Sequence, residues 1–179
     1  NNIAAIGITD YFTIDGYKKI KEEYLKNDKK LFEIFQDSAV VEKIKHIKLF
    51  ANIEFRLDIP IVKEKNVNGK KETETSRVNY HVIFSDKIDT KDIEENFLHE
   101  IDFVYEKLPF QSPNTRKLKK INIEALGENI KTQQSTFVGD NFEIGCSVAV
   151  VKNDQINTIL QSHKDIFDGK YLIVVPVDE

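Results

Sequence analysis

The chain opens with an apolar run, from Ile3 to Ile8, that stops at a carboxylate, Asp10. A strand without a polar face is typical of a parallel sheet that helices cover on both sides. Such a strand delivers its last side chains to the carboxyl edge of the sheet, where α/β folds keep their binding groups. The pattern therefore predicts a buried first strand, and it makes Asp10 the first candidate for a functional residue.

The rest of the chain alternates between helical and extended patterns, which indicates an α/β fold. Helices are expected at residues 17–25, 29–46 with a break near Asp37, 90–101, 121–131 and 154–162. Strands are expected at residues 47–62, 77–85, 142–151 and 171–177, the last of them buried. The polar segment 63–76 holds an Asn68-Gly69 turn signal and predicts an inserted β-hairpin. Pro60 indicates that the far end of the first hairpin strand lies at an edge.

The two hairpin strands carry polar side chains on one face. Between residues 53 and 59, apolar residues alternate with Glu54, Arg56 and Asp58. In the returning strand, His81 alternates with apolar neighbours in the same way. If the strands pair, Glu54 and His81 can share a face, whereas a slip of one residue would move His81 to the other side.

Composition limits the class of protein. A chain of 179 residues, 40% hydrophobic and 31% charged, predicts one domain spanning residues 1–179 with a sizeable core. The net charge of −4 argues against a broadly basic nucleic-acid surface, but it leaves room for a local phosphate-binding patch. The single cysteine, Cys146, excludes an internal disulfide. The sequence shows no signal peptide and no apolar run of about 20 residues, so we expect a cytoplasmic protein that does not enter a membrane.

Asp10, Glu54 and His81 offer the donors that a hydrolytic metal centre needs. Carboxylates and neutral imidazole bind divalent ions such as Zn, Mn or Fe, and the ion lowers the pKa of a bound water. Each residue also has an ordinary alternative: Asp10 as a cap of the following helix, Glu54 as a solvated strand residue, and His81 as a hydrogen-bonded histidine within a sheet. Arg56 lies on the face of Glu54 and suits a phosphate, or it pairs with Asp58.

Three segments, in this order, resemble motifs of the PHP (polymerase and histidinol phosphatase) domain, of the type found at the N-terminus of large AAA-like ATPases. They are ITDY at 8–11, NIEFRL at 52–57 and NYHVIF at 79–84. The resemblance implies a partial or distorted β/α barrel in which Asp10 and His81 bind metal and Glu54 bridges a pair of ions. It also implies a metal-dependent phosphoesterase acting on nucleic acid or nucleotide phosphates, with Arg56 orienting the phosphate. PHP domains open with a His-x-His pair on a first strand and close a seven-stranded barrel, whereas five or six strands are expected here. The resemblance therefore further implies a fragment that lacks its first strand and its C-terminal portion, or a branch that has dispensed with the pair, with an ATPase domain in the same longer chain.

Tyr11 occupies the position where many PHP domains have a histidine. A phenol, with a pKa of about 10, is a poor metal ligand at neutral pH. We therefore expect one metal position to be altered, and Tyr11 to hydrogen-bond a phosphate or a ligand instead. The alternative function is a catalytically degenerate PHP-like module that senses a ligand or docks a protein. An unrelated α/β interaction domain is the third reading, favoured if the three motif residues prove scattered.

Overall fold

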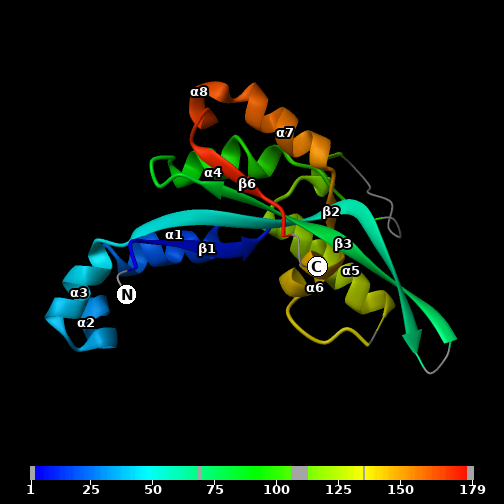
Figure 1. The fold of residues 1–179 in the computed structure, drawn as a ribbon, viewed down its shortest axis with the longest axis horizontal. Coiled ribbons are helices and arrows are strands. Elements are labelled where there is room, and N and C mark those ends of the chain that lie inside the picture. Colours follow the sequence, from blue (N-terminus) through cyan, green and yellow to red (C-terminus); the bar gives the residue numbers. More distant parts are fainter. Residues whose placement is uncertain (1–2, 68–69, 106–112, 135, 177–179) are drawn as a thin grey trace.

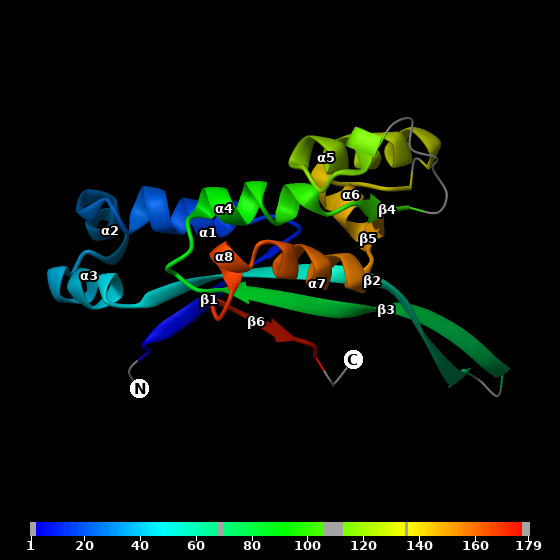
Figure 2. The same cartoon turned by 90° about the horizontal axis from the view of Figure 1, so that it is seen from above.

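An open sheet of six strands runs through the molecule, and the helices gather on one side of it (Figures 1 and 2). The computed structural model describes residues 3–67, 70–105, 113–134 and 136–176. The strands are β1 (Ala5–Tyr11), β2 (Lys48–Val67), β3 (Lys70–Phe84), β4 (Phe103–Val104), β5 (Val150–Val151) and β6 (Tyr171–Val174). The α-helices are α1 (Asp15–Lys18), α2 (Asp28–Phe35), α3 (Ser38–Lys45), α4 (Thr90–Glu95), α5 (Lys120–Gln133), α6 (Asn141–Val148), α7 (Asn153–Ser162) and α8 (Lys164–Phe167). A π-helix, η1 (Lys19–Tyr24), and two 3-10 turns, η2 (Leu98–Glu100) and η3 (Pro113–Arg116), complete the described elements.

Strand β2 is the centre of the sheet. Along one of its edges lie β1 and then β5, both parallel to it, with Tyr11 opposite Glu54 and Leu57 opposite Val151. Along its other edge β3 pairs antiparallel, and β6 and β4 extend the sheet antiparallel to β3 and β5. The described strands thus form a mostly antiparallel open sheet, and the predicted PHP-like barrel is not seen among them. The predicted α/β class and the hairpin of β2 and β3 are confirmed, whereas a β/α barrel needs successive parallel strands joined by helices.

The core lies between the sheet and the helices. Along β2 the odd-numbered residues from Leu49 to Leu57 are buried against the helices, while the even-numbered ones face the open side of the sheet. Edge-to-face contacts join Phe55, Phe97 and Phe84, with ring centroids 5.9 and 5.0 Å apart. Phe167 of α8 closes this cluster at 5.4 Å from Phe84. Aromatic packing therefore fixes α8 and the segment around Phe97 on the same face of the sheet.

Two strands that the sequence predicts as buried are exposed edge strands. In β1, which pairs only with β2 among the described residues, Ile6 is 38% exposed, and in β6 Leu172 is 67% exposed. The prediction was wrong because an apolar run shows that a segment suits a sheet but does not show how many partners and layers will cover it. The apolar run at residues 3–8 is therefore not a sign of a central parallel strand.

The helical predictions differ from the structure mainly after residue 140. Residues 142–151 were expected to be a strand, but they form most of α6 and then β5. The helix begins there because the Asp140 carboxylate accepts hydrogen bonds from the N–H groups of Phe142 and Glu143. The predicted break near Asp37 is confirmed, since Asp37 caps α3 in the same way. The expected helix at 90–101 is divided into α4 and η2, and the expected helices at 17–25, 121–131 and 154–162 are found.

The hairpin is longer than expected, because both strands continue through the polar segment 63–76. The Asn68-Gly69 turn itself lies outside the described residues. A register shift between Arg56 and Pro60 separates the part of β2 inside the sheet from a part that, among the described residues, pairs with β3 alone, which confirms the edge position of Pro60. In the described part of the chain, no helix has the length and apolar character needed to cross a bilayer.

Candidate functional site

Asp10 lies on the helix-covered side of the sheet and caps the start of α1. Its register partner on β2 is the buried Ile53, and its Oδ2 accepts a hydrogen bond of 3.1 Å from the N–H of Tyr17. A Cβ added to Gly16 would lie 2.5 Å from Asp10 Oδ1, so glycine is needed for this approach. Burial raises the pKa of Asp10, against the opposing effect of hydrogen bonds from the backbone of Tyr17 and Gly16. The carboxylate thus satisfies N–H groups of the first helical turn.

Glu54 and His81 lie directly opposite each other on the open side of the sheet, which settles the register that the sequence left open. Glu54 is only 8% exposed, and its Oε1 accepts a hydrogen bond of 2.7 Å from the Tyr11 hydroxyl. His81 Nδ1 lies 3.2 Å from Asn52 Oδ1, and Asn52 Nδ2 donates to Thr9 Oγ1 at 2.7 Å. The Asn52 oxygen can accept a hydrogen bond from Nδ1 in the tautomer that carries the proton there. A polar network thus crosses three strands.

The structure therefore brings together two of the three expected metal ligands and separates the third. Asp10 and Tyr11 are adjacent in β1, so their side chains leave the sheet on opposite faces, and only Tyr11 reaches Glu54. Within the described ranges no group of three or more His, Cys, Asp or Glu side chains is arranged to hold a metal ion. The donors of Asp10, Glu54 and His81 do not fit the expected divalent ion.

Tyr11 and Arg56 line a pocket of about 500 Å³ at the carboxyl end of β1. Its other wall is α6, which contributes Phe142, Glu143, Cys146 and Ser147. These four residues are spaced so that they lie on one face of the helix. Arg56 does not pair with Asp58, which accepts a hydrogen bond of 2.7 Å from Arg77. Instead, its Nη1 donates to the carbonyl oxygen of Ser147 and ties β2 to α6.

A left-handed residue positions the end of β1 beside this pocket. Phe12 has φ of 57° and its N–H donates to the Glu54 carbonyl at 3.3 Å. A non-glycine residue in this conformation is uncommon, and its cost is offset here because the buried Phe12 ring packs 5.9 Å from that of Phe55. In the α6 wall of the pocket, burial raises the pKa of the Cys146 thiol to about 12, so the thiol is protonated at neutral pH. Cys146 fills core space as expected, but in a helix and not in a strand.

The pocket residues of α6 were not among the predicted site residues. A signal was present, because Asp140 and Glu143 stand at the spacing of a helix-capping pair just before an apolar stretch. That spacing would have predicted a helix at 141–148 with Phe142 and Cys146 on one face. It would not have shown which face meets Tyr11.

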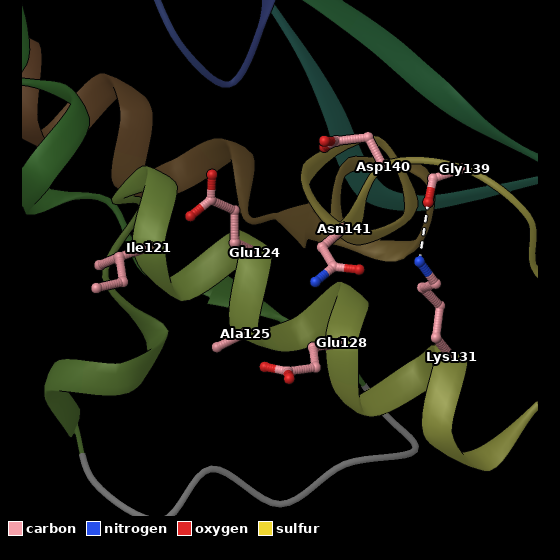
Figure 3. A pocket seen from close by; sticks show the side chains of 8 residues that line it. All are labelled: Ile121, Glu124, Ala125, Glu128, Lys131, Gly139, Asp140 and Asn141. Atoms are coloured by element: carbon pink, nitrogen blue, oxygen red, sulfur yellow. Dashed lines mark hydrogen bonds between the residues drawn. The ribbon is translucent and has the colours of Figure 1, made fainter.

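A second pocket, of about 580 Å³, lies between α5 and the start of α6 (Figure 3). Figure 3 shows the carboxylates of Glu124, Glu128 and Asp140 around it, and Lys131 Nζ donating to the Gly139 carbonyl at 3.0 Å. Its acidic side chains do not form a group that could hold a metal ion. We therefore take the pocket beside Tyr11 as the candidate site.

Comparisons of the chain with protein-family profiles, with curated proteins and with solved structures gave no match. The likeness to PHP domains thus rests on the sequence motifs alone.

Proposed function

We propose that this chain is a binding module whose pocket between β1, β2 and α6 holds a small planar ligand with an anionic group, a nucleoside monophosphate in the simplest case. The observation that carries the proposal is that Tyr11 and Arg56, both predicted to meet a phosphate, line one pocket together with an aromatic ring, Phe142. The proposal corresponds to the degenerate, ligand-sensing alternative, and membership of the PHP family and linkage to an ATPase remain part of it.

The chemistry of the pocket suits such a ligand. A guanidinium has several N–H donors, so the bond from Arg56 to Ser147 leaves others able to reach phosphate oxygens. The rings of Tyr11 and Phe142 provide faces on which a base can stack. The volume of about 500 Å³ falls in the range usual for small-molecule sites. Glu143 adds one negative charge to the lining, which favours a monophosphate over more highly charged nucleotides.

The same geometry supports binding better than turnover. Asp10 is engaged with the first turn of α1, and the Cys146 thiol is protonated, so neither is poised as a nucleophile. The Glu54 carboxylate is nearly buried under the Tyr11 hydroxyl. These arrangements hold the open face of the sheet in a fixed geometry, as a binding surface requires.

Titration calorimetry with AMP, GMP, CMP and inorganic phosphate tests the proposal. We expect a nucleoside monophosphate to bind, and Arg56→Gln to weaken binding by about tenfold or more, since charge-assisted hydrogen bonds contribute about 1.5–3 kcal/mol. Arg116→Gln is the matched control, because Arg116 pairs with Asp102 at 3.2 Å and does not line the pocket. Absence of binding by every nucleotide, or equal losses in both variants, would refute the proposal.

The metal-dependent phosphoesterase predicted from the sequence is the second candidate. It is favoured by one observation, the cross-strand pairing of Glu54 with His81. Since the three expected donors do not converge, we derive no hydrolytic step for it. Metal analysis of the purified wild-type protein and of Glu54→Ala tests this second candidate. A stoichiometric metal that is present in the wild type and lost in the variant would support it.

A further inference from the structure

Strand β6 presents an unpaired edge. Among the described residues it pairs with β3 alone, through Leu172 opposite Ile83 and Val174 opposite His81. Figure 2 shows β6 on the border of the sheet, beyond β3. The exposed fractions of Leu172, Ile173 and Val174 are 67%, 38% and 43%. An exposed apolar edge is a template for adding another strand.

The hydrogen-bonding groups of this edge follow from its pairing with β3. The Ser85 N–H donates to the carbonyl of Lys170, the residue opposite it, at 2.8 Å, while the Lys170 N–H donates to Phe167. Because hydrogen-bonded positions alternate along an antiparallel ladder, Leu172 and Val174 direct their N–H and C=O groups at β3. Residues 171 and 173 consequently point these groups away from the sheet, and residue 175, just past the end of β6, is the next position at this spacing. These three outward positions are symmetric about Ile173.

The charge pattern of the edge favours a second copy of the same strand. Residues 171–176 contain no charged side chain, so two copies can meet without like-charge repulsion and without burying an unpaired charge. A basic or acidic partner would find no complementary charge there. A two-fold axis at Ile173 matches the three outward positions of one copy with those of the other, as closed dimers require.

We propose that two copies of this chain associate by antiparallel pairing of their β6 strands, centred on Ile173. The pairing forms about six backbone hydrogen bonds, two for each pair of facing outward residues. It also places Leu172 of one copy opposite Val174 of the other on the open face of the sheet. The apolar surface continues inward through a cavity of about 210 Å³ lined by Phe50, Ile83 and Leu172. An interface of this length is at the small end for stable complexes, so we expect a dimer at micromolar concentrations.

Sedimentation equilibrium over a wide range of concentrations tests the proposal, which is independent of the nucleotide pocket. Ile173→Lys puts like charges directly opposite each other at the axis, and Ile173→Pro removes a central N–H that β3 does not use. We expect each change to weaken dimerisation by about tenfold or more. Ile121→Lys is the matched control, since Ile121 is 70% exposed on α5, and we expect its dimer to equal that of the wild type.

Circular dichroism and thermal melts establish that each variant is folded. A dimer that both Ile173 variants lose while they remain folded, and that Ile121→Lys keeps, supports the pairing. A wild-type chain that stays monomeric at high concentration overturns it, even if an added peptide occupies the edge. A dimer that survives in both folded Ile173 variants also overturns it.

Discussion

Replacement of Gly127 by alanine tests the packing that places α6 beside the pocket. Gly127 in α5 and Gly145 in α6 lie where the two helix backbones meet. A Cβ at residue 127 would lie 2.7 Å from the carbonyl carbon of Asn141 and nearer still to its oxygen. Carbon atoms in contact prefer about 3.5–4.0 Å, so the helices must separate by at least about 1 Å. In an unpacked helix the same change is favourable by about 1 kcal/mol.

The two effects oppose each other, and the structure indicates which is larger. A gap of about 1 Å forfeits up to half of the dispersion energy between facing atoms, and the two helices bury the side chains of Ile123, Leu126, Ile130 and Ile144. If each side chain loses about 0.7 kcal/mol of the roughly 1.5–3 kcal/mol that its burial contributes, the total is about 3 kcal/mol. After subtraction of the helical gain, we expect Gly127→Ala to destabilise the fold by about 2 kcal/mol. This corresponds to a Tm lower by about 4–8 °C in a domain of this size.

Denaturant unfolding of Gly127→Ala, with Glu128→Ala as the neighbouring exposed control, measures this difference. Gly145→Ala should cost a similar amount, because its Cβ would meet the backbone of Ile123. The double variant should lose less than the sum, since one separation accommodates both methyl groups. A Gly127→Ala protein as stable as the wild type, or more stable, would show that the helices do not pack this closely.

Two further outcomes follow from particular side chains. Tyr11→Phe should lower the free energy of unfolding by about 1–3 kcal/mol in denaturant titrations, because it removes the hydroxyl that donates to the nearly buried Glu54 carboxylate; no measurable loss would mean that this bond does not contribute. Burial, aided by the positive charge of Lys119, lowers the pKa of His99 from its ordinary value of 6.5. As the pH falls, His99 therefore takes up a proton in the unfolded chain before it does so in the folded one. The free energy of unfolding should consequently fall as the pH drops below about 6.5. His99→Gln should flatten that part of the pH profile of the unfolding midpoint while the exposed His46→Gln should not, and equal profiles in all three proteins would contradict this role.

Local sequence rules predicted most helices and the hairpin correctly. Asp37 marks a helix start because its side chain accepts backbone N–H groups, a property that is local and visible in the sequence. The alternation of Glu54 and Arg56 with apolar neighbours correctly predicted a strand with one buried face. The hairpin was expected, but only the structure fixes its register and so pairs Glu54 with His81.

The candidate site was only partly predictable, because its assembly depends on long-range packing. Asp10 and Tyr11 are neighbours in the sequence, and only the pairing of β1 with β2 shows that Tyr11, and not Asp10, shares a face with Glu54. Likewise, no local pattern indicates that Phe142 meets Tyr11 across the pocket. Sequence periodicity gives the face of a strand but not the element that covers it.

The edge of β2 that carries β1 and β5 is assembled from segments that lie far apart in the sequence, which affects the order of folding. The two strands that complete this edge come from near the start of the chain and from residues 150–151, and the helix that walls the pocket immediately precedes the second. Loops of this length must close before those contacts form, and such closure slows folding. During synthesis the hairpin of β2 and β3 can therefore form early by local contacts, whereas the pocket can be completed only after residues 141–151 have left the ribosome.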